Sequence, residues 1–398
     1  MKKNGIFSRT VSGLLAAALT LTLTACGGST GSADTSAAAD SASSSDSGVT
    51  HLRFAYHGSL CGAPLYIAQE KGFFADENLE VEQVTVDAAH VAEAVGSDQV
   101  DVGMGLIGKM LQPLENGLPI KFTTGVHTGC IKLLVPADSG ISTVTDLKGK
   151  NIGVPGLADA GTVVTKRSLH AAGIDASESS SEVTFTVFSR NDLAQALENG
   201  AVDAIVLGDP QASITQKQYG LNALIDTASD PEYKDEYCCA AFVTSKLAAE
   251  NPEAAAAFTR AVQKASQWVQ ENPDEAAQII VDKKYVSGEV DFNASVLKSY
   301  NYKPSVQGGY DALKLSAEQL TEIGILKEGT DATKFADNAY IFFDDVPDAP
   351  ESDASADTTA SAPTSASAVS FQPAAAAAEE DDCCGGGAAT KPVQNTKA

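Results

Sequence analysis

Basic residues are scarce in this sequence. Its 398 residues include 27 lysines and arginines against 52 acidic residues, which gives a formal net charge of −25. Three of the basic residues, Lys2, Lys3 and Arg9, lie at the N-terminus, and no basic cluster follows them. Nucleic-acid binding depends on clustered positive charge, so a nucleic-acid partner is not expected. The excess of acidic residues mainly favours solubility.

A hydrophobic run of membrane-spanning length is also lacking at the N-terminus. The apolar stretch Val11–Leu23 has 13 residues, whereas a spanning helix needs about 20. A basic start, a short apolar run and small residues at its end are typical of an export signal. Residues 23–26, Leu-Thr-Ala-Cys, resemble a bacterial lipobox. The resemblance implies that residues 1–25 are a signal peptide and that a lipid on Cys26 anchors the protein to the outer face of the bacterial cell membrane. An ordinary signal peptide that ends in Cys is the alternative.

Two segments contain little that a folded core would bury. Residues 26–48 consist mostly of Gly, Ser, Ala, Thr and Asp, and residues 347–398 are rich in Ala, Ser, Pro and Asp. Such chains cannot offset the entropy that they would lose on ordering. We therefore expect a flexible linker behind the lipid anchor and a disordered acidic tail. The folded part is then about residues 49–346, which is long enough for one large domain or two lobes.

The seven cysteines fall into three groups. Cys26 belongs to the lipobox-like motif, and Cys383 and Cys384 belong to the tail. Outside the cell the remaining thiols could form disulfides, although an anaerobic producer would leave them reduced. The sequence fixes no pairing among them. The remaining four cysteines, which belong to the folded part, are Cys61, Cys130, Cys238 and Cys239.

Short apolar strands alternate with helical patterns over the first part of the folded region. Leu52–Tyr56 and Val100–Met104 have the character of strands, and a helix that Pro64 opens lies between them. This alternation predicts a largely parallel sheet covered by helices. After Tyr237 the pattern becomes helical, and Pro252–Gln270 carries its apolar residues on one face.

The chain contains an internal repeat. Ala94–Val102 and Ala196–Ala204 each combine a helix end, a Gly-containing turn and Val-Asp before a buried strand. Asp101 and Asp203 of the two copies are 102 positions apart. A repeat of this length indicates a duplicated domain and not a solenoid, so we expect two related α/β lobes in sequence.

Several separated motifs resemble one family of proteins. They are the segment Gly62–Phe74 (GAPLYIAQEKGFF), Leu79–Val81, Val100–Gly103, Asp146–Val154, Gly200–Ala204 and Asp209-Pro210. In this order they are similar to the solute-binding proteins of ABC transporters for nitrate, sulfonate, taurine and thiamine precursors, a family that also includes the fungal thiamine-pyrimidine synthase. The resemblance implies an α/β type II periplasmic-binding-protein fold, with two lobes, a hinge and a ligand cleft. Lobe one would be residues 49–136 plus 240–346, and lobe two residues 137–239.

The resemblance also implies where the ligand lies. In open α/β sheets, ligands bind beyond the carboxyl ends of the strands. None of the loops expected there contains arginine, which commonly clamps sulfonate or phosphate, so we favour a neutral or weakly cationic heterocycle as the ligand. The candidate ligand-binding residues are His57, Ser59, Cys61, Gly105, Leu106, His127, Thr128, Gly129, Cys130, Asp159, Gly161, Thr162, Asp209 and Tyr237.

A metal or redox site is one alternative. Two histidines and two cysteines in these loops, together with two cysteines near the return crossover, have the chemistry of a soft-metal or iron centre. No paired CxxC spacing supports that interpretation, and buried thiols or a Cys61–Cys130 disulfide explain the same residues. We therefore predict neither a metal ion nor a cofactor. The residues in question are His57, Cys61, His127, Cys130, Cys238 and Cys239.

An enzyme is the other alternative. The fungal synthase of the family uses a lysine just after the Val-Asp strand, where this sequence has Gly105, and a histidine where it has Lys109. Of the family's Cys-Cys-Cys-Phe-Cys motif, only Cys238 and Cys239 remain before Phe242. Without that lysine no imine can form there, so no catalysis is expected. The prediction is a monomeric, lipid-anchored binding protein that delivers a small polar organic molecule to an ABC permease and its ATPase.

Overall fold

The computed structural model describes residues 48–87, 90–177, 180 and 182–350. The predicted signal peptide, Cys26, the linker up to residue 47, and the tail from residue 351 with Cys383 and Cys384 lie outside the described residues. Within the described ranges, none of the helices combines the length and the apolar character that crossing a bilayer requires.

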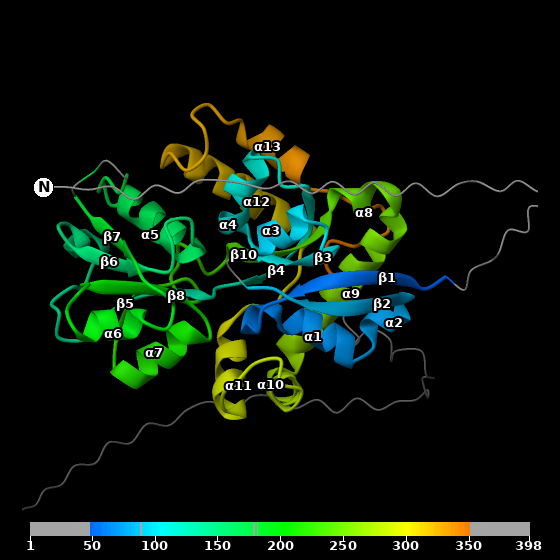
Figure 1. Ribbon diagram of the computed structural model, residues 1–398, viewed down its shortest axis with the longest axis horizontal. Coiled ribbons are helices and arrows are strands. Elements are labelled where there is room, and N and C mark those ends of the chain that lie inside the picture. Colours follow the sequence, from blue (N-terminus) through cyan, green and yellow to red (C-terminus); the bar gives the residue numbers. More distant parts are fainter. Residues whose placement is uncertain (1–47, 88–89, 178–179, 181, 351–398) are drawn as a thin grey trace, which may run out of the picture. The chain divides into compact units, whose positions relative to one another are not determined.

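The first of two sheets contains five strands in the order β2-β1-β3-β10-β4 (Figure 1). Strand β1 is parallel to both β2 and β3, whereas β10 is antiparallel to β3 and to β4. The return strand β10 therefore makes this sheet mixed and not purely parallel. The strands are β1 (Thr50–Tyr56), β2 (Leu79–Thr85), β3 (Val102–Leu106), β4 (Ile120–Thr128) and β10 (Tyr237–Thr244).

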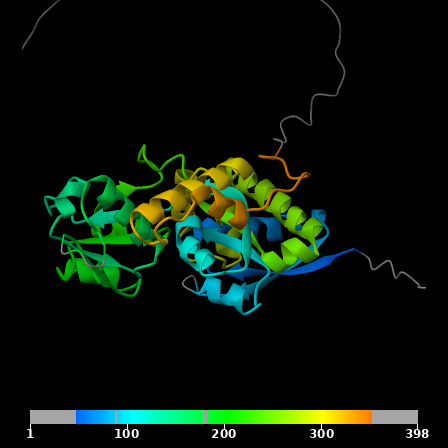
Figure 2. The ribbon, with the colours of Figure 1, turned by 90° about the horizontal axis from the view of Figure 1, so that it is seen from above.

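The second sheet has the same arrangement, in the order β7-β6-β8-β5-β9. Strand β6 is parallel to β7 and β8, and β5 is antiparallel to β8 and β9. Figures 1 and 2 both show the strands and helices of this sheet, drawn mostly in green, gathered in one group. The strands are β5 (Ile131–Val135), β6 (Asn151–Val154), β7 (Thr184–Val187), β8 (Ala204–Gly208) and β9 (Asn222–Asp226).

The aspartates of the two Val-Asp copies make equivalent hydrogen bonds in the two sheets, which confirms the predicted repeat. The Asp101 carboxylate accepts a hydrogen bond from the backbone N–H of Arg53 at 2.9 Å. The Asp203 carboxylate accepts one from the backbone N–H of Asn151 at 2.8 Å. In each sheet the aspartate thus binds the backbone of the neighbouring strand, in the middle of β1 at Arg53 and at the first residue of β6, Asn151.

Thirteen α-helices connect and cover these strands in the part of the chain that the structure describes. Helix α9 shows why they form: Asn251 caps its first turn, Pro252 opens it, and Phe258 and Val262 belong to its buried face. Trp268 on this helix is half-buried against the core, with the Lys71 ammonium 4.3 Å above its ring. The helices are α1 (Ala63–Glu70), α2 (Phe73–Asp76), α3 (Val91–Gly96), α4 (Ile107–Glu115), α5 (Ala160–Ala171), α6 (Leu193–Glu198), α7 (Gln211–Tyr219), α8 (Ser245–Glu250), α9 (Pro252–Glu271), α10 (Pro273–Asp282), α11 (Val290–Ser299), α12 (Val306–Glu322) and α13 (Ala332–Ala339).

Strand pairing differs from the predicted lobes near their boundaries. Strand β5, expected within the first lobe, is hydrogen-bonded in the second sheet, and Tyr237–Cys239, expected in the second lobe, belong to β10 of the first sheet. The reason is that each antiparallel strand continues directly from a crossover between the sheets. The division into lobes itself stays a prediction.

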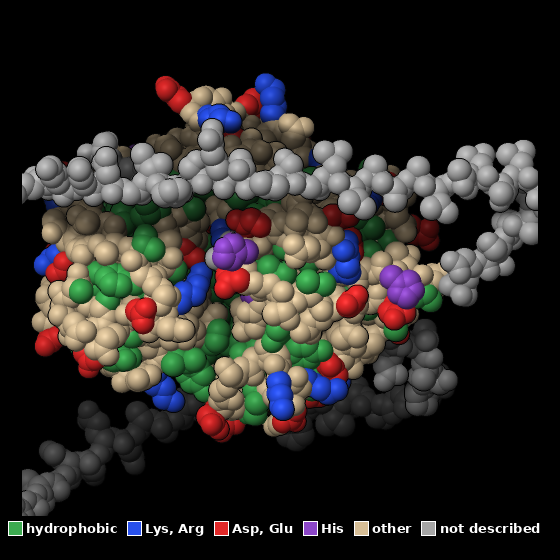
Figure 3. Space-filling view, viewed as in Figure 1, with side chains coloured by type: hydrophobic (Ala, Val, Ile, Leu, Met, Phe, Trp, Pro, Cys, Tyr) green, Lys and Arg blue, Asp and Glu red, His purple; other side chains and the backbone are tan. Residues whose placement is uncertain are grey.

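Charged side chains are mixed on the face of the molecule that Figure 3 shows. Lysines and arginines lie among acidic side chains there and do not gather into a basic patch. This distribution agrees with the low proportion of basic residues in the sequence.

Candidate functional site

Two crossovers link the sheets, and they lie in direct contact. The first follows β4, where Gly129 has φ +65°, and the second runs from β9 to β10. The Thr227 hydroxyl oxygen accepts hydrogen bonds from the backbone N–H groups of Cys130 (3.0 Å) and Ile131 (2.9 Å). A Cβ atom at Gly129 would lie 2.4 Å from the Cα of Ala228. Glycine is therefore required here by its backbone conformation and by the close approach.

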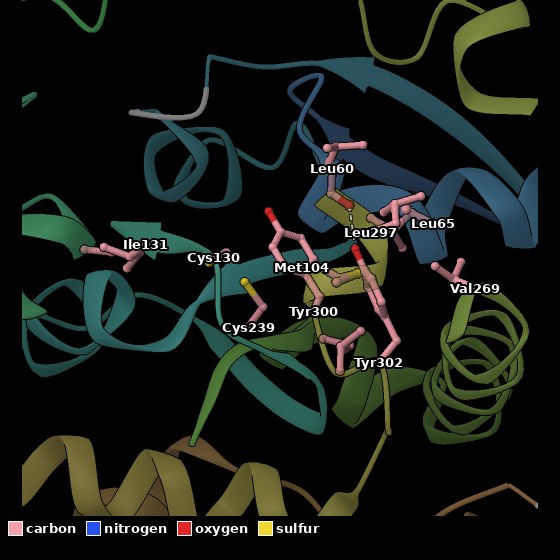
Figure 4. Close-up of a cluster of buried hydrophobic side chains, with 14 of the residues drawn as sticks. Leu60, Leu65, Met104, Cys130, Ile131, Cys239, Val269, Leu297, Tyr300 and Tyr302 are labelled. Atoms are coloured by element: carbon pink, nitrogen blue, oxygen red, sulfur yellow. Dashed lines mark hydrogen bonds between the residues drawn. The ribbon is translucent and has the colours of Figure 1, made fainter. Parts of the chain in front are cut away.

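Beside the crossovers, four thiols and one imidazole meet. The Sγ atoms of Cys130 and Cys238 are 3.3 Å apart, and all four cysteines are free. Two overlapping triads, Cys61–His127–Cys239 and Cys130–Cys238–Cys239, each have their potential ligand atoms within 4.8 Å of one another. Figure 4 shows Cys130 and Cys239 together with the aromatic rings that cover them. We call this group the thiol cluster; its members are Cys61, His127, Cys130, Cys238 and Cys239.

Two tyrosines from the segment after α11 cover the thiol cluster. The ring of Tyr300 stacks on His127 with centroids 5.2 Å apart and planes at 7°, and the Tyr302 ring lies 4.9 Å from His127. The Tyr302 hydroxyl donates to the Leu60 carbonyl at 2.8 Å (Figure 4). The Tyr300 hydroxyl and His127 Nε2 are buried and have no hydrogen-bond partner among the described residues. Buried polar atoms without partners are uncommon, and each one calls for a physical explanation.

The contacts among the thiols separate their acidities. A hydrogen bond with Cys238 raises the pKa of the Cys130 thiol to about 11. Burial acts to raise the pKa of Cys238 as well, but hydrogen bonds with Cys130 and Cys239 outweigh it and lower this pKa to about 7. Cys238 is therefore the first of the four to ionise, because its neighbours donate to its thiolate.

Several charged or titratable side chains lie near the carboxyl ends of the strands, and they come from the sides of both sheets. The Arg190 guanidinium is 2.5 Å from the Asp159 carboxylate, which also accepts from the Gly161 N–H and caps α5. Burial, followed by the positive charges of Lys109 and Arg190, lowers the pKa of His57 to about 4. Burial also lowers the pKa of Lys109, and the charge of Asp159 acts to raise it. Residues from both sheets therefore influence one another across this region.

Sequence reasoning missed Arg190. The loops considered at the sheet edges did not include the one after β7, although β7 is parallel to β6 and both strands end at the same edge. That shared edge is the signal that could have identified Arg190. The named ligand loops contain no arginine, but Arg190 from outside them reaches Asp159 in one of these loops through an ion pair.

The end of β3, the start of α4 and the first turns of α5 line a small pocket. Leu106, Ile107 and Gly108 face the first turns of α5 there. Its volume is about 40 Å³, whereas pockets for organic ligands occupy roughly 300–1,000 Å³. An organic ligand therefore fits only if these walls separate. The other lining residues are Ile131, Ala160, Val163, Val164, Arg167, Thr227, Tyr233, Glu236, Tyr237, Cys238 and Ser316.

An ion pair closes one side of this pocket. Arg167 of α5 binds Glu236 of the return crossover through two parallel hydrogen bonds of 2.9 and 2.7 Å. Both side chains are largely buried, with exposures of 9% and 14%. The bidentate contact thus ties the second sheet's main helix to the second crossover.

Most of the remaining predicted residues have local structural partners. The Asp209 carboxylate is buried and accepts from the Ser213 N–H at 2.7 Å, and burial raises its pKa. The Thr162 hydroxyl donates to the Gly156 carbonyl at 2.7 Å, and Tyr237 donates to the Lys303 carbonyl at 2.5 Å. Ser59 Oγ is buried without a partner among the described residues.

Two further tyrosines of the first sheet's side pack internally. Tyr66 is 1% exposed and stacks on Tyr285 with ring centroids 4.6 Å apart. Tyr56 packs edge-on against Tyr66 and donates its hydroxyl hydrogen to the Tyr285 carbonyl. Thr128 is buried at the end of β4, and Gly105 and Leu106 end β3.

Comparisons with known sequences give one family and two kinds of relative. A family model described as NMT1/THI5 like matches residues 62–276, more than half of the chain. A Bacillus subtilis (strain 168) protein named as a candidate aliphatic sulfonates-binding protein is 28% identical over 260 residues, which are 63% of this chain and 75% of that protein. An Aspergillus parasiticus protein named 4-amino-5-hydroxymethyl-2-methylpyrimidine phosphate synthase is 27% identical over 257 residues, which are 58% of this chain and 70% of that protein.

Solved structures with the same fold are periplasmic binding proteins. The aliphatic sulphonate binding protein SsuA from Escherichia coli matches with a TM-score of 0.60 and 16% identity, over 72% of this chain and 91% of SsuA. The nitrate-binding protein NrtA from Synechocystis PCC 6803 matches with a TM-score of 0.62 and 18% identity, over 73% of this chain and 86% of NrtA. The predicted periplasmic-binding-protein fold is thereby confirmed.

Proposed function

The chain belongs to the NMT1/THI5-like family, and on this basis we propose that it is an extracytoplasmic solute-binding protein of an ABC importer. One observation carries the proposal. The carboxyl end of β3 and the start of α4 face the start of α5, so that Leu106 and Ile107 from the first sheet's side line one pocket with Ala160 and Val163 from the second sheet's side. This is where ligands bind in α/β sheets.

Ligand capture would use motion at the crossovers. Only the Thr128–Ile131 segment and the segment between β9 and β10 join the sheets through the chain. A rotation about these two adjacent segments would separate the pocket walls, admit a molecule and close over it. The closed form would then present the surface that a permease recognises.

The ligand would be a small polar organic molecule. His57, Lys109 and Arg190 lie close enough for their charges to influence one another and bring nitrogen donors to this region, and Asp159 supplies one opposing charge. The preference for a neutral or weakly cationic heterocycle was based on the lack of arginine in the expected ligand loops. Arg190 now supplies a guanidinium beside one of these loops, so that basis no longer applies. Anionic organic molecules and pyrimidines therefore belong in the same ligand screen.

Several residues support binding without catalysis. A Cβ atom at Gly105 would already lie 3.3 Å from Met110 Cγ, so the place that a lysine takes in the synthase is crowded here. The lipobox-like motif supports a lipid anchor at Cys26 and an outer-face location. The partners would be the membrane, through this lipid, and an ABC permease with its ATPase, with the binding protein acting as a monomer and without a cofactor for catalysis.

The test is a thermal-unfolding screen of the purified protein with aliphatic sulfonates, nitrate, amino acids and pyrimidines. We expect at least one compound class to raise the melting temperature, because a ligand that binds only the folded state stabilises it. Arg190→Gln should weaken that shift, and Lys148→Gln, at an exposed lysine just before β6, is the matched control that should leave it unchanged. If no compound raised the melting temperature, the proposal would lose its basis.

A further inference from the structure

We propose that the thiol cluster is a binding site for one thiophilic metal ion of d¹⁰ configuration, Zn²⁺ or Cu⁺. Thiolate sulfur and imidazole nitrogen are the donors that such ions prefer. The cluster offers four sulfurs, two of them on buried and two on half-buried cysteines, and one imidazole, in two overlapping triads. Cys238 also lines the pocket between the two sheets, so the cluster borders that pocket. The inference rests on the donor atoms of the cluster and does not depend on the proposed transport function.

The spacing of the donors suits a single ion. With Zn–S bonds of about 2.3 Å, the sulfurs of a tetrahedral site lie about 3.8 Å apart. The Sγ atoms of Cys130 and Cys238 are 3.3 Å apart, which is slightly less than this sulfur–sulfur distance. The ligand atoms of each triad lie within 4.8 Å of one another, which is an upper limit slightly above it. Small side-chain rotations therefore suffice. Cys239 belongs to both triads, so the geometry assigns it as the central ligand, with Cys61 and His127 beside it and Cys130 or Cys238 as the fourth.

The histidine is arranged as a ligating histidine would be. His127 Nδ1 lies 3.2 Å from the Thr128 carbonyl oxygen, to which it can donate. Nδ1 also lies 3.6 Å from Cys238 Sγ. When Nδ1 carries the proton, the lone pair is on Nε2, which is buried without a partner among the described residues. A backbone carbonyl that orients the second ring nitrogen is the usual outer-shell arrangement of a metal-bound histidine. A bound ion supplies the partner that Nε2 lacks.

The position of the cluster points to a resident ion. Cys130, Cys239 and His127 are buried, and the rings of Tyr300 and Tyr302 cover them. Cys130 follows the first crossover and Cys238 the second. An ion bound by Cys130 or Cys238, together with Cys61 and Cys239, would connect segments that are far apart in the sequence. Metal binding is therefore expected to raise the melting temperature, and the thiols that bind release their protons to the buffer.

The experiment uses the full chain, purified anaerobically with reductant and stripped with a chelator. Co²⁺ is added first, because thiolate–Co²⁺ charge transfer gives an absorption band that reports sulfur ligation. Zn²⁺ and Cu⁺ are then titrated in competition with a chelator, and bound metal is counted by mass spectrometry. The two titrations distinguish the ions. Variants are Cys239→Ser, Cys61→Ser and His127→Asn, with the double substitution Cys383→Ser/Cys384→Ser as the matched control in the tail.

We expect one metal ion per chain, a sulfur–Co²⁺ band, and affinity reduced by about 100-fold or more in Cys239→Ser. The tail control should bind as the unsubstituted protein does. If the reduced, unsubstituted protein gave no charge-transfer band and held no metal, the proposal would be overturned whatever the variants do. Binding that disappears in the tail control but persists in Cys61→Ser and Cys239→Ser would overturn it equally. Because the first readout needs no variant, a substitution that prevents folding leaves the test decisive.

Discussion

His57 provides a quantitative test of the electrostatics of the candidate site. Its imidazole lies at the carboxyl end of β1, where burial and the charges of Lys109 and Arg190 lower its pKa from 6.5 to about 4, against an opposing contribution from Asp87. The fall corresponds to at most about 3 kcal/mol of folding free energy, since each pKa unit is worth about 1.36 kcal/mol. The folded protein thus holds His57 neutral at neutral pH.

The sign of the pH dependence follows from this lowered pKa. Between pH 6.5 and about 4 the unfolded chain binds a proton at His57 that the folded chain does not bind. The contribution of the neutral His57 to stability is therefore fully present above pH 6.5, is lost progressively as the pH falls from 6.5 to about 4, and changes no further below that. A His57→Gln variant lacks this titration, so its stability should fall less over the same range, by up to about 3 kcal/mol.

The assay is urea unfolding of the unsubstituted and His57→Gln proteins at several pH values from 7.5 to 4. Nuclear magnetic resonance of the imidazole gives the pKa directly. His51, an exposed histidine on the same strand, is the control position, and His51→Gln should leave the pH profile almost unchanged. Parallel stability curves for the unsubstituted and His57→Gln proteins, or a measured pKa near 6.5 for His57, would refute the reasoning.

Three further predictions concern the crossovers and the pocket. Gly129→Ala should destabilise the protein by about 2 kcal/mol or more in urea unfolding, because φ is +65° and the new Cβ would meet Ala228. Gly140→Ala, where φ is +74° and nothing lies within 4 Å, is the control, and an equal effect there would contradict the close-approach argument. Arg167→Met should lower the free energy of unfolding by about 3–5 kcal/mol, because it leaves Glu236 buried without its partner. The double variant Arg167→Met/Glu236→Gln should recover part of this loss. If it recovered none, the isolated charge of Glu236 would not be the cause. Thr227→Val should lower the unfolding free energy by about 1–3 kcal/mol, since the Cys130 and Ile131 N–H groups lose their acceptor; an unchanged midpoint would contradict this role.

Local pattern was enough to predict most of the strands and helices. The apolar run around Phe54, the capped helix that begins at Pro252 and the repeated Val-Asp turns all form the expected elements. These features depend on neighbours in the sequence. The matching order of the two sheets follows from the same repeat.

Long-range pairing was harder to predict. The return strand β10 enters between β3 and β4, and this register places Cys239 opposite both Leu106 and His127. No local pattern around Cys239 specifies such partners. The sequence interpretation placed the cysteines in loops but could not bring Cys130 against Cys238, because their contact depends on the meeting of two crossovers.

The same limit applies to the residues that complete the candidate site. Tyr300 and Tyr302 come from the end of the folded part, yet they cover a histidine of β4. Arg190 reaches Asp159 across the edge shared by β6 and β7. In each case side chains from distant segments meet because of the packing of whole elements, which a single sequence does not encode locally.

The most direct test of the account is a distance measurement between the two sheets with and without the ligand that the thermal screen identifies. Spin labels carried by non-natural amino acids at Gln83 of β2 and Gln218 of α7, both exposed, avoid the native thiols. The account predicts a broad distance distribution that narrows and shifts to the closed distance when ligand is added. A ligand that stabilises the protein and leaves this distribution unchanged would contradict capture by closure of the two halves.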